Sequence, residues 1–134
     1  MVYRIHGTRL SLLISTHGPP IPPKDTLLLF ITTLYTVTAA LYPHGDTLFQ
    51  KRERQDFVHG PLGLTVRDSS PTDYRLSYFE VGGVVEGLAQ FVQQYGYLYV
   101  RFEIHENEVG LIGIGRVYKT SYTLPPENVS LATS

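Results

Sequence analysis

A helix followed directly by a two-stranded hairpin, over residues 77–119, is the feature that most constrains the fold of this chain. Ser77 and Glu80 have the S-x-x-E spacing of a capping box, in which each side chain accepts a hydrogen bond from the backbone amide of the other residue. Leu76 and Val81 stand where a hydrophobic staple would pack against this cap. The pattern therefore predicts a helix that begins after Ser77.

The body of this helix is predicted from apolar residues that recur at i, i+3, i+4 and i+7. They are Tyr78, Val81, Val84, Val85, Leu88, Val92 and Tyr95. Gly96 is well placed to end the helix in a left-handed conformation. Gly82, Gly83 and Gly87 each cost roughly 1 kcal/mol relative to alanine. Packing must therefore stabilise this helix, and we expect another backbone to approach these glycines closely.

The hairpin is predicted from strict alternation over residues 97–105, because side chains of a strand point to opposite faces in turn. One face takes Leu98, Val100, Phe102 and Ile104, and the other takes Tyr97, Tyr99, Arg101, Glu103 and His105. Residues 106–109 form the turn, and residues 110–119 return as the second strand.

The register of the return strand has two solutions that expose opposite faces. A two-residue loop pairs Phe102 with Gly113 and turns Ile112 and Ile114 outward, where Arg116 and Tyr118 join the polar face. A three-residue loop pairs Phe102 with Ile112 and turns both isoleucines inward. We favour the first register, which makes the outer face an interface.

The remainder of the chain supplies a second helix and further strands. Residues 25–42 are predicted to form a helix that Asp25 or Thr26 caps and Pro43 stops, although the β-branched residues at 31–38 also permit a strand. Strands are expected at residues 2–5 and 9–15, with a proline-rich loop at 16–24. A charged edge strand is expected within 47–59 and a return strand within 62–67.

We therefore predict an α+β fold with two helices packed on one face of a mainly antiparallel sheet of four or more strands. The two halves share the order helix, strand, strand, which suggests a degenerate αββ duplication. Residues 1–119 are expected to form a single domain, and residues 120–134 a flexible tail.

Composition narrows the classes of function. The formal net charge of -1 lacks the basic excess of a nucleic-acid-binding protein, so no nucleic-acid partner is expected. The chain has no cysteine, which excludes disulfides and thiolate chemistry and favours a cytoplasmic location. The apolar segment 27–42 is interrupted by threonines and is short for a transmembrane span, so a membrane partner is not expected. A peripheral membrane protein that binds lipid through Leu27 to Leu41 is the third functional hypothesis.

No catalytic motif is recognisable, so whether the chain is an enzyme is left open. The histidines have no metal-ligand spacing, and we expect no metal or cofactor. The residues that face outward from the hairpin are the candidate ligand or interface set. They are Tyr97, Tyr99, Arg101, Glu103, His105, Ile112, Ile114, Arg116 and Tyr118. The alternative is a solvated sheet face with cross-strand ion pairs.

The leading functional prediction is a small binding or assembly module that forms a homodimer through this sheet face. It rests on a charged share of 17% and on ten tyrosines, which suggest a covered surface. The alternative is a small-molecule-binding protein or enzyme that uses the Tyr, Arg, Glu and His cluster of the hairpin.

Overall fold

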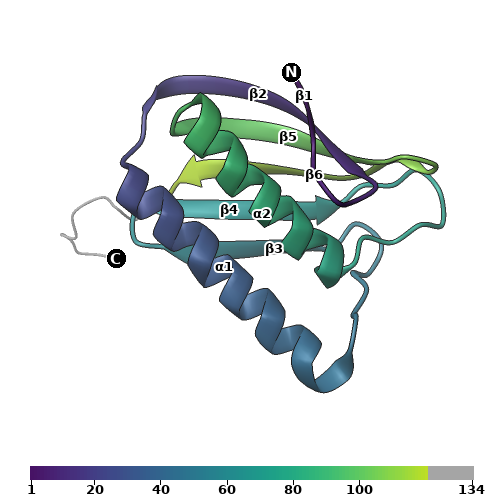
Figure 1. Ribbon diagram of the computed structural model, residues 1–134. Helices are drawn as coiled ribbons and strands as arrows, with labels where there is room; N and C mark the ends of the chain where they lie inside the picture. Colours follow the sequence, from purple (N-terminus) through teal and green to yellow (C-terminus); the bar gives the residue numbers. More distant parts are fainter. Residues whose placement is uncertain (121–134) are drawn as a thin grey trace.

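The computed structural model describes residues 1–120, which form one six-stranded sheet with two helices on the same face of it (Figure 1). The strands are β1 (Val2–Arg4), β2 (Leu10–Pro20), β3 (Arg54–His59), β4 (Leu62–Asp68), β5 (Leu98–Glu106) and β6 (Gly110–Lys119), and the helices are α1 (Pro23–His44) and α2 (Tyr78–Tyr95). The strand order is β1-β2-β5-β6-β4-β3, and every neighbouring pair is antiparallel. The predicted α+β fold is confirmed.

Two units of the order helix, strand, strand meet at the centre of the sheet. Hairpin β3–β4 follows α1, hairpin β5–β6 follows α2, and the second strands β4 and β6 pair with each other. Hairpin β1–β2 extends the sheet beyond β5. The element order thus matches the predicted αββ repetition, with one additional hairpin at the N-terminus.

The start and end of α2 are confirmed as predicted. Ser77 Oγ accepts the backbone N–H of Glu80 at 3.0 Å, and the Glu80 carboxylate accepts the N–H of Ser77 at 2.9 Å. Leu76 and Val81 are both fully buried beside this cap. The helix ends at Gly96, whose φ of 116° lies in the left-handed region that favours glycine. Local sequence signals therefore suffice to place this helix.

The glycines of α2 have a different neighbour from the one expected. A β-carbon at Gly87 would lie 2.8 Å from Cγ1 of Ile5, so a side chain of the N-terminal segment, and not a backbone, approaches the helix there. Gly87 is buried, although the periodicity places it on the polar side. The absence of a side chain at this position makes room for Ile5 in the core.

Helix α1 confirms the predicted helix and corrects two details of its ends. The segment is a helix and not a strand, and it begins at Pro23 after Pro22 at the cap, so neither Asp25 nor Thr26 caps it. It continues past Tyr42 and includes Pro43, because proline's fixed φ is close to the helical value and only the last turn follows. Its inner side contributes Leu29, Phe30 and Val37 to the core.

Strand β2 is longer than predicted, because it continues to Pro20 through a segment expected to be a loop. Strand β1 pairs only with residues 11–13, so the second half of β2 has a neighbour, β5, on one side alone. Proline is tolerated at such an edge, where its missing N–H is not needed. The register shifts between His17 and Pro20, which accommodates the turn-forming Gly18.

The observed register of β5–β6 differs from both predicted registers. Phe102 lies opposite Gly115 and Ile104 opposite Gly113, and an irregularity then makes Leu111 the partner of His105. Ile112 occupies the extra position and is 0% exposed in the core, so the prediction that it faces outward is wrong. Ile114, by contrast, lies opposite Glu103 on the outer face and is exposed. A one-residue bulge thus separates the two isoleucines.

The C-terminal tail, predicted for 120–134, lies outside the described residues except for Thr120. That residue is buried, and its backbone N–H donates to the carbonyl of Pro61 at 2.9 Å.

Candidate functional site: the open face of the sheet

The face of the sheet opposite the helices is open and contains a hollow of about 700 Å³. Its lining includes side chains from β2, β3, β4, β5 and β6, and none from either helix. We call the charged part of this surface the arginine face, defined by Arg54, Arg67, Arg101 and Arg116. Two acidic residues, Asp56 and Glu103, share the hollow with them. Cationic groups therefore outnumber anionic groups on this face.

Strand pairing places the arginines next to one another. Arg101 lies directly opposite Arg116 across β5–β6, and Arg54 lies directly opposite Arg67 across β3–β4. Arg116 also lies opposite Thr65, two residues from Arg67 on the same face of β4. Since adjacent strands are about 4.8 Å apart, the four positions form one band across four strands. Like charges directly opposite each other destabilise a sheet.

Few counter-charges neutralise this band. Arg54 forms an ion pair with Asp56, with 3.3 Å between Nη2 and Oδ2. Glu103 is engaged by His105, with 2.9 Å between Oε1 and Nε2. Within residues 1–120, the side chains of Arg67 and Arg101 form no hydrogen bond or ion pair, and Arg116 has no acidic partner. Three guanidinium groups thus remain available to a ligand.

Arg116 is oriented by an aromatic ring that rests on a glycine. Its guanidinium carbon lies 5.1 Å from the centroid of the Tyr118 ring, a cation–π distance. The ring in turn covers Gly63, where an added β-carbon would overlap it. On β4, Thr65 pairs with Arg116 on one side and with Asp56 on the other. Its hydroxyl is buried and has no hydrogen-bond partner in the described part of the chain. The stacking on Tyr118 therefore preorganises Arg116, whereas the Thr65 hydroxyl at the floor of the hollow still lacks a hydrogen-bond partner among the described residues.

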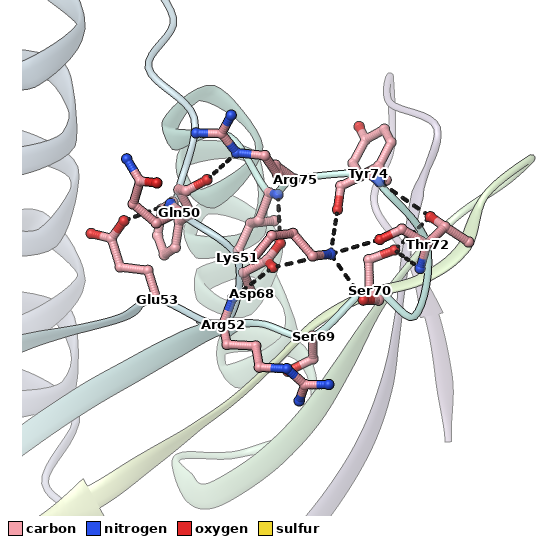
Figure 2. Close-up of polar contacts among 12 residues, drawn as sticks. Gln50, Lys51, Arg52, Glu53, Asp68, Ser69, Ser70, Thr72, Tyr74 and Arg75 are labelled. Carbon is pink, nitrogen blue, oxygen red and sulfur yellow. Dashed lines mark hydrogen bonds and ion pairs between the residues drawn. The ribbon is translucent and has the colours of Figure 1, made fainter.

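A network of polar contacts anchors the strands that carry Arg54 and Arg67 (Figure 2). Asp68 follows Arg67 at the end of β4, is 0% exposed, and accepts the backbone N–H groups of Arg52 at 3.0 Å and Leu76 at 2.8 Å. Lys51 lies 3.7 Å from the same carboxylate. Its ammonium also donates to three backbone carbonyls, those of Ser70, Thr72 and Tyr74. These groups are occupied with one another, so the network is structural.

A second anchor joins the turn before β2 to the turn after β5, at the same end of the sheet as Asp68. Arg9 Nε donates to Glu106 Oε2 at 2.8 Å, and the backbone N–H groups of Glu108 and Val109 donate to Oε1. These hydrogen bonds, first that of Arg9, lower the pKa of Glu106 to about 2. In the loop before α2, burial and a hydrogen bond to Glu80 raise the pKa of Tyr74 above its usual range.

The structure brings five of the nine sequence-derived candidates together in the hollow. They are Arg101, Glu103, Ile114, Arg116 and Tyr118. The other four lie elsewhere. Tyr97 packs partly against the core, and the ring centroid of Tyr99 lies 6.1 Å from that of His17. His105 binds Glu103, and Ile112 is buried.

Arg54 and Arg67 were not recognised as site residues from the sequence. The alternation in residues 62–67 does predict that Arg67 faces outward. It does not reveal that β4 pairs with β6, which is what brings Arg67 beside Arg116. No local signal encodes that long-range pairing.

The chemical groups of this site are suited to binding negative charge. Arginine presents a planar fork of donors that binds carboxylate or phosphate oxygens in pairs. Among residues 1–120, no group of three or more His, Asp or Glu side chains is placed to hold a metal ion. No family model, curated protein or solved structure matches this chain.

Proposed function

We propose that this protein is a binding module whose arginine face docks a carboxylate-rich segment of a partner protein. The observation that carries the proposal is the set of three guanidinium groups, those of Arg67, Arg101 and Arg116, without acidic partners in residues 1–120 on an open, hollowed face. An acidic partner removes the mutual repulsion of these groups and satisfies their donors at once.

The surroundings of the arginines favour a protein partner. Leu13 and Ile114 are exposed apolar groups in the same hollow, beside Tyr118. Arginine and aromatic residues around an apolar centre are typical of protein–protein interfaces. A nucleic acid would meet the acidic Asp56 and Glu103 on this face and a chain of net charge -1.

The predicted homodimer through this face has less support. Two copies face to face would bring arginines against arginines, and like-charge contacts across an interface are costly. With Ile112 in the core, Ile114 and Leu13 are the exposed aliphatic residues in the hollow. We therefore assign the face to a partner of opposite charge, and not to a second copy.

A small anionic molecule is the second candidate, because the volume of about 700 Å³ lies in the range of ligand sites. The two candidate functions differ in the ligand that the arginine face would bind. The test is an NMR titration of the isotope-labelled full chain with an oligoglutamate peptide, with succinate, and with inorganic phosphate, using oligoglutamine as the uncharged control.

We expect oligoglutamate to shift the side-chain Nε–H resonances of Arg67, Arg101 and Arg116, and added salt to reverse the shifts. Succinate or phosphate should act only at much higher concentration, because each fills a fraction of the hollow. Saturation by succinate or phosphate at the peptide's own concentrations would favour the small-molecule candidate. No shift with any anion at low salt would refute both.

A further inference from the structure

The outer side of α1 is an exposed, uncharged surface on which large apolar side chains alternate with Thr36 and Thr38. Ile31 is 60% exposed, Tyr35 76% and Tyr42 92%. Their spacing of four and then seven residues places them on one side of the helix. Phe30 and Val37 point the other way, into the core. We call Ile31, Tyr35 and Tyr42 the α1 stripe.

This stripe has no charged residue near it on the helix. Residues 26–45 include no Asp, Glu, Lys or Arg. A surface helix ordinarily carries charged groups on its solvent side, and a helix that is apolar all round is ordinarily buried. By length and composition alone, residues 23–42 would suffice to cross a membrane, with a mean hydropathy of 1.4, but 28% of that stretch is buried inside the protein. The stripe therefore lacks the cover that its composition predicts.

We propose that a second copy of the chain covers the α1 stripe, with α1 packed against its symmetry mate about a two-fold axis. An uncharged surface meets itself without repulsion, whereas the arginine face does not. Symmetric self-contact is also the commonest form of oligomer. The tyrosines and low charge that predicted self-association from the sequence are thus assigned to the helix, and not to the sheet.

A membrane surface fits the stripe less well. Helices that lie on membranes carry Lys and Arg on the polar side of the apolar stripe, and α1 has one such residue, Lys24, at its first turn. A spanning arrangement would pull Leu29, Phe30 and Val37 out of the core. Both facts favour a protein surface as the occupant.

The size of the stripe sets the expected strength. A tyrosine buries about 150–250 Å² when fully covered, so four tyrosines in a dimer supply roughly 600–1,000 Å². Two copies of Ile31 add to this sum. The total is near the lower limit of about 1,000 Å² for a specific interface, so the dimer should form at micromolar concentration.

The dimer would present two binding faces. Both helices cover one side of the sheet (Figure 1). The lining of the hollow includes no residue of either helix, so the arginine face is on the other side. Pairing through α1 therefore leaves both arginine faces directed outward, and the assembly can hold two acidic segments at once.

The test is sedimentation velocity of the full chain over a series from low to high micromolar. We expect the wild type to shift from monomer to dimer, and Tyr35→Glu to raise the dimer dissociation constant at least about tenfold, because a buried unpaired carboxylate is costly. Gln93→Glu, on the exposed side of α2, is the matched control and should dimerise as the wild type does. Tyr42→Glu repeats the test if Tyr35→Glu does not fold by circular dichroism.

Three outcomes would overturn the proposal. The first is a wild type that stays monomeric throughout, and the second is a Tyr35→Glu variant that dimerises normally. The third is cosedimentation of the wild type with phosphatidylcholine–phosphatidylserine vesicles that Tyr35→Glu abolishes, which would assign the stripe to a membrane. These outcomes leave the assignment of the arginine face untouched, because no variant alters it.

Discussion

The two faces of the sheet consist of alternate residues of the same strands, but the described chain closes only one of them. On the covered face, Leu12, Leu64 and Ile104 are fully buried under α1 and α2. On the open face, their immediate neighbours Leu13, Thr65 and Glu103 line the hollow with the arginines. The difference teaches that burial determines stability on one face, whereas uncompensated charge on the other face is the basis of the proposed recognition.

The sharpest comparison is a pair of adjacent leucines on β2. Leu12 is 0% exposed and Leu13 is 43% exposed. We expect Leu12→Ala to lower the free energy of unfolding by about 2–5 kcal/mol, since it leaves a cavity in the core. Leu13→Ala should change it by about 0.5 kcal/mol. Urea denaturation measures both, and equal losses would mean that the open face is covered in solution.

Two aspartates extend the comparison to charged groups. Asp68 is buried and accepts two backbone N–H groups, whereas Asp56 forms an ion pair with the exposed Arg54. Asp68→Asn should cost about 1.5–3 kcal/mol, the contribution of hydrogen bonds to a charged group. Asp56→Asn should cost about 0–1 kcal/mol in the same denaturation experiment. Similar costs would remove the structural role given to the Asp68 network.

On the open face, removing a charged side chain should raise stability rather than lower it. Arg101 and Arg116 lie directly opposite each other, so Arg101→Gln removes a like-charge contact and should raise stability by about 0.2–1 kcal/mol. The gain should shrink at high salt, where the charges are screened. Arg4→Gln, an exposed arginine on β1 away from the hollow, is the matched control with no gain expected. Destabilisation by Arg101→Gln would show that the arginines are already neutralised.

The smallest effect concerns acid stability at the turns. The pKa of Glu106 is lowered to about 2, so its ionised form stabilises the folded state. That contribution is fully present above the unfolded pKa of about 4.3 and is lost as pH falls toward 2. Glu106→Gln should therefore flatten part of the acid limb of a thermal-stability profile between those pH values. An unchanged acid limb would contradict the role assigned to the Arg9–Glu106 pair.

Much of the covered face was predictable, because its signals are local. The capping box at Ser77, the periodicity of α2 and the alternation in β5 each depend on residues within one element. Such patterns determine which residues share a face. They were sufficient for two helices on one side of an antiparallel sheet.

The open face was predictable only in part, because its composition depends on strand neighbours and on one bulge. Arg101, Glu103 and Arg116 share a face by alternation alone. Arg67 joins them because β4 pairs with β6, some fifty residues further along the chain. Ile112 leaves the face because one irregular position follows Ile104, and alternation cannot reveal a bulge.

The most direct test of the central claim is a charge-swap titration measured by calorimetry. The wild type should bind oligoglutamate and not oligolysine, and Arg101→Glu/Arg116→Glu should weaken oligoglutamate binding by about tenfold per arginine. The swapped variant should in turn bind oligolysine, while Arg4→Glu leaves both affinities unchanged. Equal affinity of the wild type and the swapped variant for oligoglutamate would contradict the assignment of the arginine face.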